Sequence, residues 1–154
     1  DPSAPQTSSP HEMQRYLSKI SGPLLDRIDI HIEVTPVPFE KLSDDRKAES
    51  SVDIRQRVTA ARELQSQRFA FLENIHYNAQ MNTKHIREFC ALDDASKELL
   101  KTAMERLNLS ARAYDRILKV SRTIADLEAS PNVMASHIAE AIQYRSLDRE
   151  GWLG

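Results

Sequence analysis

The sequence predicts a mainly α-helical protein, a helical bundle to which one isolated β-strand is attached. From residue 44 onward, apolar residues recur every three or four positions, which is the period of an amphipathic helix. The same region lacks the clusters of Gly, Pro and β-branched residues that mark strands. Only residues 28–34 alternate apolar and polar side chains in the way that a half-buried strand does. These three observations define the expected fold class.

The first 43 residues divide into a leader and a short structured stretch. Residues 1–12 are rich in Pro, Ser and Thr, which predicts a disordered leader or linker. A short helix is expected over 13–20, ended by a Ser-Gly-Pro sequence, and the strand 28–34 follows. A lone strand leaves its backbone groups unpaired. We therefore expect its sheet to lie elsewhere, and the strand itself to be disordered or paired with a neighbouring chain.

Five amphipathic helices with short connections are expected after residue 44, and together they make a bundle. The first spans 45–71 and presents a buried face made of Ile54, Val58, Ala61 and Leu64. The remaining helices are expected at 84–90 with Thr83 as N-cap, 93–107, 111–128 with Ser110 as N-cap, and 135–146.

The composition fits one domain and excludes several classes of function. The 154 residues are 40% hydrophobic, which suffices for a core, and carry a net charge of −2. Such a chain has no overall attraction for nucleic acid or for anionic membranes, so any basic site is local. Only three glycines occur, and no Lys follows any of them. Because loops that cradle phosphates need several glycines, a self-sufficient P-loop ATPase or Rossmann enzyme is excluded.

Signals for membranes, secretion and metals are weak. No apolar run approaches the roughly 20 residues that cross a bilayer, and the first residues do not resemble a secretion signal, so we expect a cytoplasmic protein without a membrane partner. The five histidines and Cys90 show no ligand spacing, so no metal site is expected. Cys90 is predicted as a small core residue, and Tyr114 and Tyr144 as core or boundary aromatics.

The helix expected at 111–128 carries the most regular polar pattern. Its apolar side is expected to hold Tyr114, Ile117, Leu118, Ser121, Ile124 and Ala125. The opposite side holds Arg112, Arg116 and Lys119, which form a basic stripe. Arg112 also lies in the first turn, where unpaired N–H groups favour an anion. The stripe predicts an edge that faces phosphates. The alternative, which the pattern alone favours, is a solvated face partly neutralised by Asp115 and Asp126.

A second candidate is Arg27, which stands between Asp26 and Asp29 where a loop meets the expected strand. Its planar guanidinium suits phosphate, and from this place it could reach a neighbouring molecule. The alternative is an intramolecular ion pair with Asp26 or Asp29. Since an acidic neighbour could also hold the arginine in place for use in another subunit, both interpretations stay open.

Two segments together resemble a known family. Residues 15–29 read RYLSKISGPLLDRID, and residues 109–127 read LSARAYDRILKVSRTIADL. Both resemble the C-terminal portion of the magnesium chelatase-like AAA+ ATPases of the ComM (YifB) type, and the likeness covers nearly the whole chain from about residue 10. It implies that residues 13–43 are the end of an AAA+ core, with the arginine-finger loop and a strand left over from that core, and that 44–154 are the helical lid domain.

The resemblance also implies roles for the candidate arginines. Arg27 would be the arginine finger, which acts on ATP bound at the adjacent subunit of a ring. Arg112 would be the sensor 2 arginine, which contacts the nucleotide phosphates and couples their state to the position of the lid. Arg116 is a secondary candidate for nucleotide binding. Because the sequence does not begin with methionine, we expect it to be a piece of a longer protein. Without Walker motifs, this piece should be inactive alone.

Cofactors and partners follow from the same resemblance. ATP and Mg²⁺ would be bound in the full-length protein only. The expected partners are the protein's own N-terminal AAA+ core, further copies in a homo-oligomeric ring, expected to be a hexamer, and DNA, which the family is linked to remodelling by branch migration in natural transformation. Two alternatives stay open: a magnesium chelatase ATPase subunit, and an ATP-independent helical module that binds DNA or protein through the basic stripe.

Overall fold

The structure is a computed structural model that describes Arg15, Leu24, residues 27–32, Val34 and residues 48–145. Its elements are helices, namely α4 Ser51–Arg68, the 3-10 helix η1 Asn78–Gln80, α5 Thr83–Phe89, α6 Asp94–Arg106, α7 Ala111–Leu127 and α8 Ala135–Gln143. The predicted helical fold class is confirmed. The predictions for the leader 1–12 and, apart from Arg15, for the helix 13–20 lie outside the described residues.

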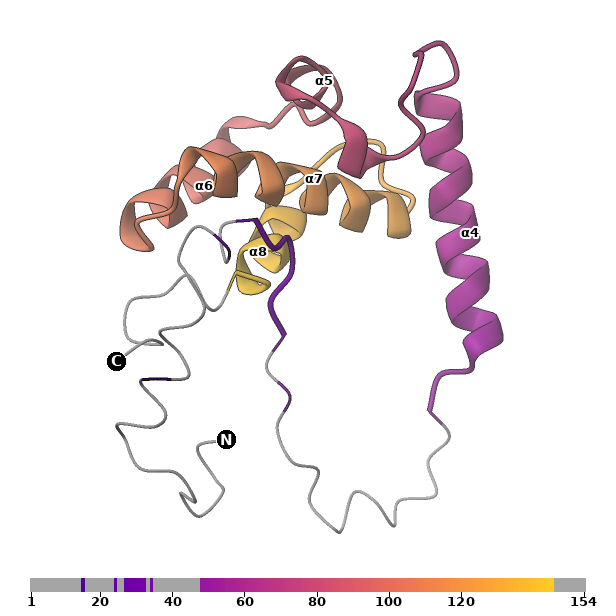
Figure 1. Ribbon diagram of the computed structural model, residues 1–154, viewed down its shortest axis with the longest axis horizontal. Coiled ribbons are helices and arrows are strands. Elements are labelled where there is room, and N and C mark those ends of the chain that lie inside the picture. Colours follow the sequence, from indigo (N-terminus) through magenta and orange to yellow (C-terminus); the bar gives the residue numbers. More distant parts are fainter. Residues whose placement is uncertain (1–14, 16–23, 25–26, 33, 35–47, 146–154) are drawn as a thin grey trace, which may run out of the picture.

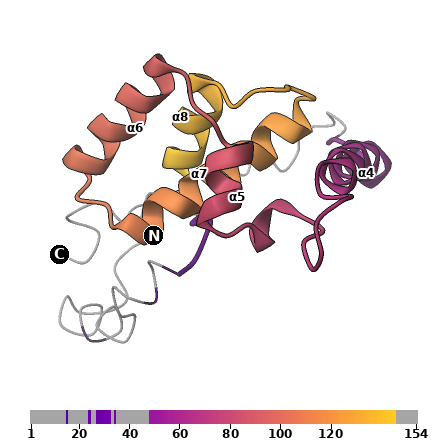
Figure 2. The same ribbon diagram turned by 90° about the horizontal axis from the view of Figure 1, so that it is seen from above.

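Helix α7 is the centre of the fold. It crosses the middle of the molecule in Figure 1, with α5 above it and α8 below it, and α4 stands across its C-terminal end. Figure 2 shows α6 and α8 side by side, while α4 is seen almost end-on at the edge of the molecule. Helix α7 contacts α4, η1, α5 and α8, so its position fixes the positions of most other elements.

The core gathers around the apolar side of α7. The predicted side is confirmed for Ile117, Leu118, Ser121, Ile124 and Ala125, which are all buried. Tyr114 was predicted with them, but it is 41% exposed. It lines an open groove between α5, α6 and the start of α7, and no other described element covers it there. Cys90 is buried in the same core, as predicted.

Helix α4 differs from its prediction. It begins at Ser51, capped by Ser50, and ends at Arg68 rather than at residue 71. Of the predicted buried face only Ala61 is buried, since Ile54 and Val58 are 41% and 46% exposed. The reason is geometric: only the second half of α4 packs on the bundle, and the first half extends beyond it (Figure 1). The sequence does have the predicted hydrophobic period, but the described residues supply no partner for the first half of α4.

The helix ends follow local chemistry. Asn82, not the predicted Thr83, caps α5, because its side chain accepts hydrogen bonds from the N–H groups of Lys84 and His85. Ser110 caps α7 as predicted and accepts from the N–H of Ala113 at 3.2 Å. Helix α8 ends at Gln143, three residues before the predicted end.

Residues 28–32 and Val34 do not form a strand in the described part of the chain. This corrects the expectation of a strand over 28–34, whose residue 33 lies outside the described set. The physical reason is that a strand needs a neighbouring strand for its backbone hydrogen bonds, and the described residues provide none. Leu92 and Val133 form an isolated parallel bridge far from this segment in sequence. Among the described helices none combines the length and the hydropathy required to cross a bilayer.

Candidate functional site

The segment 27–32 lies against α7 and α8, and three contacts hold it there. The carboxylate of Asp29 forms an ion pair with the guanidinium of Arg116 on α7. The backbone N–H of His31 donates to the carbonyl oxygen of Tyr144, just after α8, at 2.7 Å. The guanidinium of Arg145 donates to the carbonyl oxygen of Ile28. These contacts bring the N-terminal segment beside the C-terminal half of the chain (Figure 1).

The two predicted phosphate-binding arginines are both exposed. Arg27 begins the docked segment, and its backbone N–H donates to the carbonyl oxygen of Leu24 at 2.9 Å. Arg112 lies in the first turn of α7. Within the described ranges no acidic side chain forms an ion pair with Arg112. The pair of Asp29 and Arg116 links the backbone two residues after Arg27 to the backbone one helical turn after Arg112.

The first turn of α7 suits an anion for reasons of backbone geometry. The N–H groups at the start of a helix have no partner within the helix, and the peptide dipoles add a partial positive charge there. Ser110 satisfies one of these groups through the 3.2 Å bond to Ala113. Arg112, whose side chain is exposed, belongs to the same turn. This arrangement can hold a phosphate oxygen, provided that the remaining walls of such a site come from another part of the protein or another subunit.

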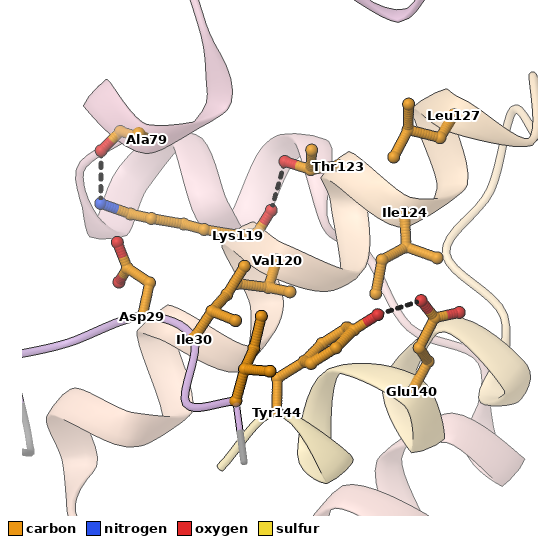
Figure 3. Close-up of a pocket in the computed structure, with 11 residues that line it drawn as sticks. Asp29, Ile30, Ala79, Lys119, Val120, Thr123, Ile124, Leu127, Glu140 and Tyr144 are labelled. Atoms are coloured by element: carbon orange, nitrogen blue, oxygen red, sulfur yellow. Dashed lines mark hydrogen bonds between the residues drawn. The ribbon is translucent and has the colours of Figure 1, made fainter. Parts of the chain in front are cut away.

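The basic stripe is divided by internal contacts. Arg116 is engaged by Asp29, and the ammonium group of Lys119 donates to the carbonyl oxygen of Ala79 in η1 at 3.0 Å (Figure 3). Of the three residues in the stripe, only Arg112 lacks such a contact among the described residues. The interpretation of the stripe as a continuous phosphate-binding edge is therefore not supported by the arrangement of its side chains.

An apolar cavity of about 360 Å³ lies beside the stripe, between the docked segment, α7 and α8. Figure 3 shows Ile30, Val120 and Tyr144 converging on it. The hydroxyl of Tyr144 donates to Glu140 at 3.0 Å, and this hydrogen bond raises the pKa of the phenol. The predicted boundary position of Tyr144 is confirmed, because its ring lines the cavity while its hydroxyl meets a carboxylate.

The sequence analysis did not predict a buried network of charges at the C-terminal end of α7. Asp126 was interpreted as part of a solvated face, but it is 2% exposed. Its carboxylate accepts hydrogen bonds from Arg68 at 2.8 Å, from Arg122 at 3.1 Å and from the side chain of Asn78 at 2.8 Å. Arg122 also donates to two carbonyl oxygens of the loop that follows α7. Burial lowers the pKa of Arg122, and Asp126 acts in the opposite direction.

The network could have been suspected from one signal. Arg122 and Asp126 stand four residues apart, and a helical projection places both at the edge of the apolar side of α7. Oppositely charged residues in such a place are more consistent with a buried pair than with a solvated face. Nothing in the sequence, however, indicates that Arg68 from α4 completes the group.

The described residues contain no group of three His, Cys, Asp or Glu side chains arranged to hold a metal ion. Cys90 is 3% exposed, and burial raises the pKa of its thiol to about 12. Such a thiol is almost entirely protonated near neutral pH, so it is neither a nucleophile nor a good metal ligand there.

Comparisons with known proteins identify the family of the chain. A family described as magnesium chelatase, subunit ChlI C-terminal, matches residues 48–145, which make up most of the chain. The chain belongs to this family. A second family, described as magnesium chelatase, subunit ChlI, matches residues 1–42. The boundary between the two matches falls between the docked segment and α4, and the resemblance drawn from the sequence is confirmed.

The similar curated proteins are of the ComM and YifB type. The chain is 42% identical over 143 residues to the competence protein ComM of Haemophilus influenzae and 41% identical over 142 residues to the uncharacterized protein YifB of Escherichia coli. An uncharacterized protein of Mycobacterium tuberculosis is 34% identical over 132 residues. The first two alignments cover 92% of this chain but 27% of the relatives, so the chain spans about a quarter of their length.

Proposed function

We propose that this chain is the C-terminal, lid-forming part of a ComM-type ATPase that works as a ring of identical subunits and uses ATP with Mg²⁺ to remodel DNA. In this proposal, Arg27 is the arginine finger for ATP bound at an adjacent subunit, and Arg112 contacts the nucleotide phosphates. ATP hydrolysis requires the longer protein, because the residues that would cradle the phosphates and hold Mg²⁺ are not in this chain. The membership of the magnesium chelatase family supports the proposal.

One observation carries the assignment of Arg112. Its side chain is exposed in the first turn of a capped helix, without an ion pair to any described residue, where the backbone already favours an anion. Arg68 and Arg122, by contrast, are both engaged by the buried carboxylate of Asp126. Exposure also supports the assignment of Arg27, because a finger must reach a phosphate on another molecule.

The alternative of an ATP-independent DNA-binding module is less favoured. It requires Arg112, Arg116 and Lys119 to present a continuous row of charges to a phosphate backbone. The contacts of Arg116 with Asp29 and of Lys119 with Ala79 take two of these three charges out of the row. A single remaining arginine is too little for stable binding, because phosphate contacts act through their number.

The decisive experiment uses the full-length protein and a mixture of two inactive variants. Arg27→Ala should abolish ATP hydrolysis while the affinity for ATP stays within about twofold, since a finger acts mainly in the transition state. Mixing this variant with subunits whose own nucleotide site is disabled should restore part of the activity, because the finger of one subunit serves the next. Arg55→Ala, on the exposed part of α4, is the matched control and should leave hydrolysis unchanged.

A second variant tests Arg112. Arg112→Ala should weaken ATP binding and slow hydrolysis, and neither effect should be restored by mixing if the residue contacts nucleotide in its own subunit. The proposal is wrong if the full-length protein hydrolyses no ATP. It is also wrong if the isolated chain binds duplex DNA with a salt dependence that falls by about one unit for each stripe arginine removed.

A further inference from the structure

We propose that the ion pair of Asp29 and Arg116 is a positioning device that makes the two phosphate-binding arginines, Arg27 and Arg112, move as one unit. This inference rests on the proposed function, in which both arginines contact ATP. It gives Arg116 a role different from the nucleotide binding expected from the sequence. The guanidinium of Arg116 holds another part of the protein, and it acts on ATP only through the neighbours that it positions.

The first argument is the register of the pair. Asp29 and Arg116 are 87 residues apart in the sequence, yet their side chains meet. Asp29 follows Arg27 by two residues of a short segment, and Arg116 follows Arg112 by one turn of a rigid helix. If a ligand at Arg112 displaces α7, the ion pair of Asp29 and Arg116 therefore transmits the displacement to the backbone beside Arg27.

The second argument is the strength of the link. The side chain of Arg116 is 29% exposed and that of Asp29 is 50% exposed, so water screens the pair only in part. Arginine and a carboxylate also form charge-assisted hydrogen bonds, and the planar fork of arginine loses little freedom in making them. The pair is thus better shielded from water than the pair of Lys97 and Asp94 on α6, whose side chains are 63% and 101% exposed.

The third argument is that the segment has a separate anchor. The N–H of His31 donates to Tyr144, and Arg145 donates to Ile28, so the end of α8 holds the segment through its backbone. These backbone contacts do not involve the side chain at position 29. Losing the ion pair should therefore loosen the segment relative to α7 without detaching it, which is the behaviour required of a coupling element.

The consequence is communication between two nucleotide sites. In the proposed ring, Arg112 reports on the ATP of one site, while Arg27 acts on the ATP of another. Because the ion pair ties the two backbones, the phosphate state at the first site biases the position of the finger at the second. A coupling of this kind needs only a difference in contacts between the two nucleotide states.

The experiment is a double-mutant cycle in the full-length protein. Asp29→Asn and Arg116→Gln remove the two charges with little change of size. Each should lower kcat for ATP about three- to tenfold and leave KM within about twofold, and the double variant should be no slower than the slower single variant. Arg116→Lys, which keeps the charge, should retain more activity than Arg116→Gln. Glu49→Gln, which breaks the exposed pair with Arg57 on α4, is the control and should have no effect.

Hydrogen exchange supplies a readout that does not depend on activity. Asp29→Asn should speed the exchange of backbone amides over 27–32, whereas Glu49→Gln should not. Unchanged exchange would overturn the inference, and so would additive effects of the two substitutions on kcat. A rise in KM with Arg116→Gln beside a silent Asp29→Asn would show that Arg116 binds nucleotide directly, which also overturns it.

The two proposals fail in distinguishable ways. If Arg27→Ala abolishes hydrolysis while every variant of the ion pair behaves as wild type, the proposed function stands and the coupling is wrong. If the folded wild-type protein hydrolyses no ATP, the proposed function is wrong and the coupling falls with it.

Discussion

Asp126 near the end of α7 accepts a 2.8 Å hydrogen bond from Arg68 at the end of α4, across 58 residues of sequence. Arg122 and Asn78 complete the surroundings of the same carboxylate. One buried anion thus joins α4, η1, α7 and the loop after α7. The packing of α4 depends on this group more than on apolar contacts, because most of the apolar residues of α4 lie outside the core.

Removing the charge of Asp126 should destabilise the fold strongly. Asp126→Asn leaves Arg68 and Arg122 without their shared anion, and breaking a buried ion pair from one side costs about 3–5 kcal/mol. Urea unfolding followed by circular dichroism measures the loss. Asp115→Asn, on the same helix but partly exposed, is the control and should change stability by less than about 0.5 kcal/mol. Equal effects of the two substitutions would contradict the assigned importance of the network.

The cap of α7 should have a measurable effect of its own. Ser110→Ala removes the acceptor for the N–H of Ala113 and should cost about 1 kcal/mol of stability. The same change should reduce the contribution of Arg112 to nucleotide binding, since that residue lies in the turn that the cap fixes. Ser136→Ala, exposed in the first turn of α8, is the matched control and should be nearly neutral in both measurements.

Ala129, just after α7, has a strained backbone conformation that a substitution can relieve. Ala129 has φ of 54°, and the N–H groups of Ala129 and Ser130 bond back to the carbonyls of Asp126 and Ala125. This left-handed position normally holds glycine or asparagine, as Asn108 does after α6. Ala129→Gly should therefore raise stability by about 0.5–1 kcal/mol. Ala60→Gly, exposed within α4, should lower it by about 1 kcal/mol, and a thermal melt distinguishes the two signs.

The single cysteine offers a test of burial and of pH dependence. Burial raises the pKa of the Cys90 thiol from 9.0 to about 12, because it disfavours the thiolate. The folded state therefore binds the proton more tightly. This contribution to stability is complete below pH 9.0 and is lost as the pH rises toward 12.

The same burial predicts slow chemistry at Cys90. At pH 8 a disulfide reagent that releases a coloured thiolate should label the native protein about a thousandfold more slowly than the urea-unfolded protein. The chain has one Cys, so the signal has a single source. Rapid labelling of the native protein would mean that Cys90 is accessible, and Cys90→Ala supplies the blank for the assay.

The sequence predicted the helices well because their signals are local. The 3.6-residue period located α6, α7 and α8, and the side chain of Ser110 marked the start of α7. The caps of short helices were less certain, since Asn82 and Thr83 are both good capping residues and only the backbone geometry decides between them.

The contacts between distant residues could not be predicted in the same way. The apolar period of α4 gave no hint that Ile54 and Val58 would extend past the bundle, because period alone does not say how much of a helix finds a partner. The pairing of Arg116 with Asp29 joins two segments that are independent in sequence. The exposed positions of Arg27 and Arg112 agree with the site expected from the family resemblance, while their phosphate-binding roles stay predictions.

The docking of residues 27–32 also has a consequence for the order of folding. Arg145 and Ile28 meet across 117 residues, whereas the helices from α4 to α8 are connected through short loops. Because loop-closure entropy must be spent before a non-local contact forms, this contact is expected after the local contacts within and between successive helices. We therefore expect the helices to form the nucleus and residues 27–32 to dock last, so that during synthesis Arg27 reaches its final position only after α8 has been made.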